Sequence, residues 1–342
     1  MRKYYKTLLA LIIGTTTMFA QENVTYQKPS KEILQLADFE RAPSVSMDSK
    51  KELMLLTYRN TYKNLNDLNQ DELRLGGLRI NPNTNISSTA TFINNIKLKK
   101  VTDKQETQVK GLPVNANISN LSWSPDETKI AFTNTTNSGN ELWVLDIKTA
   151  TATKLTDAVL NANLGNPITW FKDNQNLMIK VLPENRKALI DPAKDIPTGP
   201  IVSVSESGTV SQNRTYQDLL KNKTDEANFE NIVTSELYKI DLKGNKSLFK
   251  KGDMFVGETF SPDGNYIMLT TLEKPFSYIV PLNRFPMKTI VYDTNGKEIK
   301  VVNESPINEV MPKGFMAVKT GKRSLSWRAD QPASLFFVEA LD

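Results

Sequence analysis

Four aspartates recur at like places after an aromatic residue, and carboxylates are the groups with which this chain could carry out acid–base chemistry. They are Asp126, Asp173, Asp263 and Asp330. Their dispersal along the sequence does not suggest the two facing carboxylates of a glycosidase. In the string "SPDG" at 261–264 the proline sets φ, the aspartate can bond the backbone two residues later, and the glycine accepts a positive φ. The pattern favours a turn-building role over a catalytic one.

The composition excludes several common catalytic chemistries. The 342 residues contain no His and no Cys. A Ser-His-Asp triad needs an imidazole to take and return a proton, and the G-x-S-x-G string of a nucleophile elbow is also missing. Zinc sites built on imidazole or thiolate, and calcium loops of the D-x-[DN]-x-[DN]-G type, are excluded as well. We therefore expect no catalytic residue, no metal site and no cofactor in this chain.

The N-terminus has the pattern of a secretory signal. Arg2, Lys3 and Lys6 precede a short apolar core, and Ala20 is a small residue suited to the position before a cut. The sequence predicts a signal peptide over 1–20, a mature chain over 21–342 and a periplasmic or secreted location. A buried N-terminal helix is the alternative. No other apolar run is long enough for a membrane helix, so no membrane partner is expected after signal removal.

The charge balance argues against a nucleic-acid partner. The formal net charge is +5, but residues 1–20 contribute three basic residues and no acid, which leaves 40 basic against 38 acidic residues. No basic stripe with interleaved aromatics stands out, and the short cluster "KLKK" is typical of a solvated strand end.

The elements that would position any site are short strands. Strand-sized runs such as "KIAFTNT", "NELWVLDIKT" and "YIMLTTL" alternate with turn residues, and helical periodicity is hard to find outside "RTYQDLLKNKTDE". Many short strands without alternating helices predict an all-β fold.

The repeated aspartates also give a period. Successive separations are 47, 90 and 67 residues, and the first is close to the period of a four-stranded propeller blade, about 40 to 50 residues. We predict a β-propeller of about seven four-stranded blades, the last one incomplete, with a long insertion near 184–233. Blades bury their faces only by stacking on neighbours. Trp123, Trp143, Trp170 and Trp327 are therefore expected between the blades, and stacking on carbohydrate is the alternative.

Longer strings resemble a known family. "LRLGGLRINPNTN", "RTYQDLL", "SELYKIDLKG", "PFSYIVPLNRFP" and "SLSWRADQPASLFFVEALD" together resemble the N-terminal part of prolyl-oligopeptidase-type serine peptidases. The most similar branch is the secreted glutamyl endopeptidases of Bacteroidetes-like bacteria and of plastids. The resemblance covers almost the whole mature chain.

The resemblance implies a function for the whole protein. Family members continue into an α/β-hydrolase domain with the Ser, Asp and His of the triad, and the propeller limits access to peptides. This chain holds none of the triad positions, so it is expected to be a fragment or the product of an early stop, and inactive alone. A stand-alone periplasmic propeller that acts as a scaffold or sensor is the alternative.

Two arginines inside the most distinctive strings are candidates for contact with substrate or with the hydrolase domain. They are Arg214 in "NRTYQDLL" and Arg284 in "PLNRFP". An enzyme that prefers glutamate needs a basic group for the substrate carboxylate, and arginine suits that role because it can bind a carboxylate with two hydrogen bonds. A structural ion pair or a hydrogen bond that anchors a loop is the other interpretation of both residues.

Overall fold

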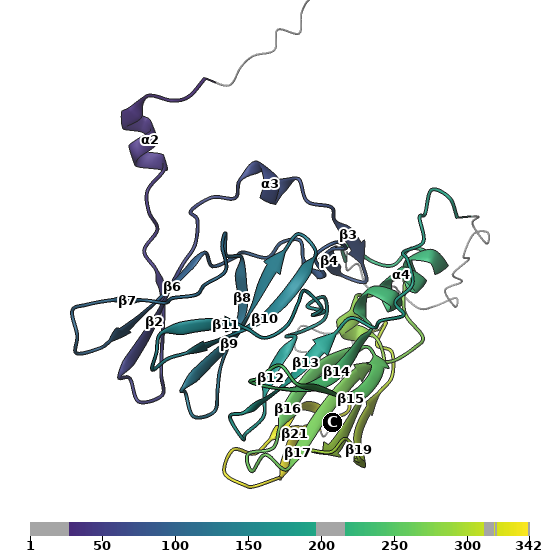
Figure 1. Cartoon of the computed structure of the whole chain (residues 1–342). Coiled ribbons are helices and arrows are strands. Elements are labelled where there is room, and N and C mark those ends of the chain that lie inside the picture. The colour runs from purple at the N-terminus through teal and green to yellow at the C-terminus, as the bar shows by residue number, and fades with distance from the viewer. Residues whose placement is uncertain (1–26, 196–215, 311–317, 319, 341–342) are drawn as a thin grey trace, which may run out of the picture. The chain divides into compact units, whose positions relative to one another are not determined.

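The computed structural model describes residues 27–195, 216–310, 318 and 320–340 (Figure 1). The chain divides into two compact units, Met1–Glu40 and Arg41–Asp342. The described part of the first unit contains helix α2 (Lys31–Ala37), and the second unit contains the strands. Among the described residues, no helix has the length and apolar character needed to cross a bilayer.

Four sheets of four strands follow one another along the second unit. The first consists of β1 (Ser44–Met47), β2 (Leu53–Tyr58), β6 (Asn95–Lys100) and β7 (Thr107–Gln108). The second consists of β8 (Ile118–Trp123), β9 (Lys129–Thr136), β10 (Gly139–Asp146) and β11 (Thr151–Lys154). The third consists of β12 (Ile168–Trp170), β13 (Asn176–Val181), β14 (Ser235–Asp241) and β15 (Lys246–Asp253). The fourth consists of β16 (Phe255–Phe260), β17 (Tyr266–Leu272), β18 (Met287–Asp293) and β19 (Glu298–Ser305).

Each sheet is an antiparallel meander, and the cores lie between successive sheets. Alternate residues of a strand face opposite neighbours: Ile130 and Phe132 on β9 pack toward the first sheet, whereas Ala131 packs toward the third. On β13, Leu177 faces the second sheet and Met178 faces the fourth. This succession of four-stranded sheets, each buried by the next, is the blade arrangement of a β-propeller, and it confirms the all-β propeller prediction. A further pair, β20 (Arg323–Trp327) and β21 (Leu335–Val338), follows the fourth blade.

Two tryptophans that stand before a turn tie their strands to the preceding blade. Trp170, the last residue of β12, donates from Nε1 to the carbonyl of Ser122 on β8 at 2.9 Å. Trp327, the last residue of β20, makes the equivalent bond to the carbonyl of Thr259 on β16 at 3.2 Å. Trp170 and Trp327 therefore lie between successive blades, as the sequence predicted.

The aspartates of the motif build turns. Asp263 Oδ1 accepts from the Ser261 hydroxyl at 2.6 Å and from the Asn265 backbone at 3.0 Å, and Gly264 has φ of +76°. The Ser261 hydroxyl and the Asn265 N–H hold the pKa of Asp263 below its ordinary value. A general acid needs a raised pKa, so this environment agrees with a turn role.

Three insertions leave the blades at the same end. They replace the connection between the second and third strand: 59–94 in the first blade, 182–234 in the third (described over 182–195 and 216–234) and 273–286 in the fourth. In an antiparallel meander these connections, and those from one blade to the next, all lie at one end of the strands. The insertion predicted near 184–233 is confirmed, and the one in the first blade was not predicted.

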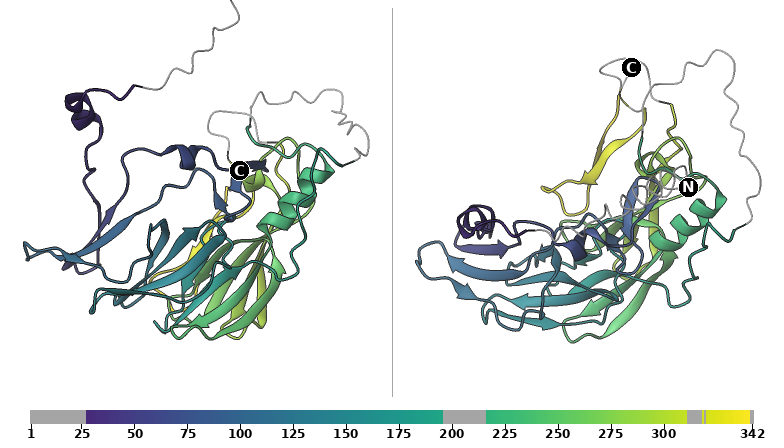
Figure 2. Two further views of the ribbon diagram at one scale, coloured as in Figure 1. Left: turned by 45° about the horizontal axis from the view of Figure 1, so that its top comes forward. Right: turned by 90° about the horizontal axis from the view of Figure 1, so that it is seen from above.

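The insertions contain the remaining short elements. The first holds α3 (Leu65–Leu68), β3 (Leu73–Leu75), β4 (Leu78–Asn81) and β5 (Ile86–Ser87). The second holds α4 (Lys223–Val233), and the third holds the 3-10 helix η1 (Leu282–Arg284). Figures 1 and 2 show β3, β4 and α4 together at one end of the sheets.

A shared hydrophobic core joins the three insertions. Phe229 on α4 is fully buried, and its ring lies 5.2 Å from that of Phe276 and 5.9 Å from that of Phe285 (centroid distances). A Cβ on Gly76, which has φ of +61°, would lie 3.0 Å from the Phe229 ring, so the first insertion approaches α4 as closely as a glycine permits. Leu75 and Ile80 of the first insertion belong to the same core. The insertions therefore pack as one body.

Candidate substrate-contact face

We call the end of the blades that carries the three insertions the insertion face. Functional residues are disproportionately found on loops that a rigid scaffold positions. Here the scaffold is the set of packed blades, and the loops are held by a common core. The insertion face is therefore the candidate functional site.

Buried asparagines fix the first insertion to the second blade. Asn140 on β10 is fully buried, and its Nδ2 donates to the carbonyls of Thr84 at 2.7 Å and Asn85 at 3.1 Å. Its Oδ1 accepts from the Thr135 hydroxyl at 2.7 Å. One side chain therefore donates to two backbone carbonyls of the insertion. Asn85, which provides one of these carbonyls, has a φ of +55°.

Arg186 links the insertions of the first and third blades. Its Nη1 donates to Asn85 Oδ1 at 2.5 Å, and Asn163 Nδ2 approaches the same oxygen at 3.5 Å. Burial lowers the pKa of Arg186 from its ordinary value. Within the described ranges no carboxylate forms an ion pair with this guanidinium. A neutral amide is therefore its main polar contact.

Asn140→Ala is expected to destabilise the protein by about 2 kcal/mol, because it removes the donor to the Thr84 carbonyl and one of the two donors to the Asn85 carbonyl, which also accepts from the Ala162 N–H. Chemical unfolding monitored by tryptophan fluorescence measures the difference. Asn137→Ala, in the exposed β9–β10 turn, is the matched control and should change stability by less than about 0.5 kcal/mol. Equal losses of stability in Asn140→Ala and Asn137→Ala would show that the hydrogen bonds of the Asn140 side chain contribute nothing to stability.

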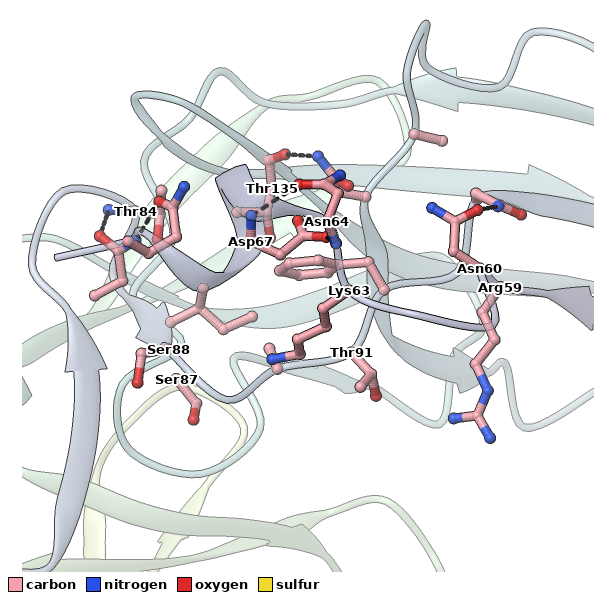
Figure 3. A pocket seen from close by; sticks show the side chains of 18 of the residues that line it. Arg59, Asn60, Lys63, Asn64, Asp67, Thr84, Ser87, Ser88, Thr91 and Thr135 are labelled. Atoms are coloured by element: carbon pink, nitrogen blue, oxygen red, sulfur yellow. Dashed lines mark hydrogen bonds between the residues drawn. The ribbon is translucent and has the colours of Figure 1, made fainter. Parts of the chain in front are cut away.

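A polar cavity of about 270 Å³ opens on the first insertion (Figure 3). Residues from 59–64 and 84–94 form much of its wall, the connection before β8 adds Asn117, and the end of β9 adds Thr135. In Figure 3 Arg59 lies at one end, Thr84 and Ser88 lie at the other, and Lys63 lies between them. We call this space the insertion cavity.

Cations predominate among the charged residues of the insertion cavity. Arg41, Arg59 and Lys63 line it, and Asp67 is its one acidic lining residue. Asp67 is already engaged in a capping box with Asn64: Asp67 Oδ2 accepts from the Asn64 N–H and Asn64 Oδ1 accepts from the Asp67 N–H, both at 2.9 Å. The cationic side chains of the cavity are therefore available to a ligand, whereas the Asp67 carboxylate caps helix α3.

Arg284 is among the described residues, but it does not line the insertion cavity. Arg284 lies in η1, its guanidinium carbon is 5.4 Å from the centroid of the Tyr216 ring, and its carbonyl accepts from the Asn308 N–H at 2.9 Å. This stacking on an aromatic ring fits an anchoring role, while contact with substrate stays a prediction. Arg214 and Ala20 lie outside the described residues.

Sequence reasoning missed the residues that the fold brings together here. Arg59 directly follows a predicted strand, and Lys63 lies in a run of polar residues, which are weak signals for a site. Asn85 and Asn140 are of a residue type that is common in ordinary turns. Among residues with described placement, no group of three or more acidic side chains is arranged to hold a metal ion.

The chain has similar sequences among known proteins. No family model matches the sequence. A probable chloroplastic glutamyl endopeptidase of Oryza sativa subsp. japonica is 32% identical over 331 residues, which is 93% of this chain and 35% of the relative. Its counterpart in Arabidopsis thaliana is 30% identical, over 91% of this chain and 33% of the relative.

Solved structures that resemble this chain include peptidases, TolB proteins and a hydrazine synthase. An acylaminoacyl peptidase from Pyrococcus horikoshii matches with a TM-score of 0.40 and 14% identity, over 79% of this chain and 33% of that one. The β-propeller domain of the trilobed protease from Pyrococcus furiosus matches with a TM-score of 0.41 and 11% identity, over 88% and 71%. By sequence, this chain is a homologue of proteins named glutamyl endopeptidases, and it spans about a third of their length.

Proposed function

We propose that this chain is the non-catalytic propeller portion of a glutamyl-endopeptidase-like serine peptidase, and that it positions or gates peptides for an α/β-hydrolase domain. The observation that carries the proposal is the extent of the sequence similarity: it covers 93% of this chain but 35% of the glutamyl endopeptidase. The rest of such a relative has room for a catalytic domain. The absence of His from this chain agrees with chemistry carried out elsewhere in the protein.

The insertion face supplies what a peptide-positioning surface needs. A peptide in an extended conformation presents backbone donors and acceptors at regular intervals, and rigid polar side chains recognise these without a large ordering cost. The insertion cavity offers amides and hydroxyls held by hydrogen bonds within the second blade, such as those of Asn117 and Thr135. The shared core fixes the first insertion, which forms much of the rest of the cavity wall.

The test compares the 342-residue chain with the product of the complete reading frame of its gene, on a fluorogenic peptide that contains glutamate. We expect no cleavage by the 342-residue chain, because it has no imidazole for a triad. We expect cleavage by the full product, lost when the serine of a downstream G-x-S-x-G string is replaced.

Two results would contradict the proposal. One is cleavage by the 342-residue chain itself, lost on substitution of one of its own serines. The other is an intact gene in which a stop codon directly follows codon 342, since a free-standing propeller would then favour a scaffold or sensor role.

A further inference from the structure

One segment of the third-blade insertion is attached to the molecule more loosely than its surroundings. Residues 183–195, which we call the strap, form no helix or strand. None of these 13 residues is buried, and Leu189 alone packs against the shared core. Among the described residues, no backbone–backbone hydrogen bond joins the strap to another segment. A segment with so few apolar and backbone contacts belongs to the least stable part of a fold.

Side chains of α4 hold the strap by its backbone. Asn228 uses both ends of its amide on one residue: its Oδ1 accepts from the Ile190 N–H at 2.8 Å, and its Nδ2 donates to the Ile190 carbonyl at 2.9 Å. Asn231 lies three residues later on α4, and its Nδ2 donates to the Lys187 carbonyl at 2.8 Å. Residues at this spacing are neighbours on the surface of a helix. The two asparagines therefore form one row of amides along α4.

Arg186 holds the strap at its other side. Its Nη1 donates to Asn85 Oδ1 of the first insertion at 2.5 Å. Each of these hydrogen bonds replaces a bond to water, so its net contribution to stability is modest. The strap therefore depends on a few separate side-chain bonds, and we call Arg186, Asn228 and Asn231 its anchor residues.

The strap does not fill the space between itself and the helix. A cavity of about 460 Å³ lies there, with Arg186 and Ile190 of the strap and Asn228 and Asn231 of α4 in its wall. Since protein interiors are normally close-packed, a cavity beneath an exposed segment means that few contacts are lost when the segment moves away. The helix itself is fixed, because Phe229 on α4 is fully buried in the shared core.

We propose that the strap is a flap, which opens away from α4 as one unit while the helix and the blades stay folded. In the closed form the strap's own backbone occupies the amides of Asn228 and Asn231. In the open form these amides offer donors and an acceptor to another extended segment of polypeptide. The flap therefore controls access to the α4 side of the insertion face. This inference does not depend on the proposed function.

Hydrogen exchange at single-residue resolution, measured on the 342-residue chain, tests the flap. The reporter is the Ile190 amide, because its N–H is bonded to Asn228 and is protected while the strap is closed. The reference is the Ile179 amide of β13, a strand paired on both sides. We expect the Ile190 amide to exchange at least about a hundredfold faster than the Ile179 amide, because the strap opens without unfolding of the blades.

Variants show whether the strap opens as one unit. Arg186→Gln should speed exchange of the Ile190 amide about fivefold, although the two residues share no hydrogen bond, because loss of one anchor raises the population of the open form. Asn231→Ala should have an effect of similar size, because it removes the donor to the Lys187 carbonyl. Asn185→Ala is the matched control: Asn185 is an exposed strap residue that is not an anchor, and its loss should leave the rate unchanged. Thermal melts verify that each variant is folded.

Three results would overturn the flap. Exchange of the Ile190 amide as slow as that of the Ile179 amide would mean that the strap is a fixed part of the fold. A faster Ile190 amide in Asn231→Ala but not in Arg186→Gln would mean that the strap frays locally beside α4. Equal acceleration in Asn185→Ala would mean that the anchor residues have no special part in closing the strap.

Discussion

Phe229→Ala is expected to lower the free energy of unfolding by about 3–5 kcal/mol, the range measured when a large buried aromatic is truncated. Phe229 is fully buried and makes edge contacts with Phe276 and Phe285, which belong to a different insertion. The substitution leaves a cavity where three insertions meet, and the blades beneath cannot collapse into it without breaking their own hydrogen-bonded strands. The loss should therefore be near the upper end of the range.

Urea unfolding followed by tryptophan fluorescence measures the total effect, and limited proteolysis locates it. We expect cleavage to appear first within 59–94 and 216–234, because these segments depend on the shared core. Leu65→Ala, in the first insertion and 83% exposed, is the control and should cost less than about 0.5 kcal/mol. A loss below about 1 kcal/mol for Phe229→Ala would mean that the insertions do not depend on one another.

Lys180→Met is expected to destabilise the protein by about 3–5 kcal/mol, the cost of breaking a buried ion pair. Lys180 Nζ on β13 lies 2.9 Å from Glu258 Oε1 on β16, and both side chains are almost fully buried. The ammonium also donates to the carbonyls of Leu164 at 2.8 Å and Phe255 at 3.0 Å. Its loss leaves two carbonyls and a carboxylate without their donor.

Lys180 and Glu258 lie close together but are poorly aligned, and the charge of this pair depends on pH. Glu258 Oε1 is buried and makes no hydrogen bond of acceptable angle, although the charges are in contact. Burial raises the pKa of Glu258 above its ordinary value of 4.5, and the nearby Lys180 charge opposes this rise. Removal of the lysine should therefore raise the pKa of Glu258 further.

The sign of the pH effect follows from proton binding. A carboxyl whose pKa is higher in the folded than in the unfolded chain binds more protons when folded, so stability is lost as the pH rises from 4.5 through the folded pKa. The destabilisation caused by Lys180→Met should accordingly be larger at about pH 8 than at about pH 5. Unfolding curves of both proteins at the two pH values measure this difference.

A double substitution provides the control for this prediction. Lys180→Met with Glu258→Leu removes both charges, and apolar pairs often replace buried ion pairs at little cost. We expect the double variant to be more stable than Lys180→Met alone and to lose the extra pH dependence. A double variant less stable than the single one would show that the charges themselves do not account for the loss.

Local chemistry made much of the fold predictable. Strand alternation and the turn residues of "SPDG" act over a few neighbours, so their outcome is visible in the sequence, and the turn role of Asp263 is confirmed by its bonds to Ser261 and Asn265. Helix α4 shows the limit of this approach. The helical pattern was expected from Arg214 onward, but the helix begins at Lys223, where Asn222 Oδ1 accepts from the Asp225 N–H at 2.8 Å. The N-cap residue Asn222 therefore sets the start of helix α4.

The candidate site was much less predictable, because its parts are distant in sequence. Arg284 and Arg214 were chosen because they lie in distinctive strings, while Lys63 and Arg59 belong to an insertion that was not foreseen in the first blade. Lys180 appears in the strand "NLMIKVL" as an ordinary exposed lysine. Its burial depends on Glu258, which lies on the next blade.

The sequence by itself determined the strands, the blade repeat, the aromatic fastenings and the absence of imidazole and thiol chemistry, since each of these depends on residue type or on neighbours close along the chain. Only the tertiary structure decided which end of the blades carries the insertions, that they share the core around Phe229, and that Arg59 and Lys63 line one cavity. The physical reason is that pairing and burial between distant segments depend on how the blades pack, and no local pattern records which side chains that packing leaves unpaired.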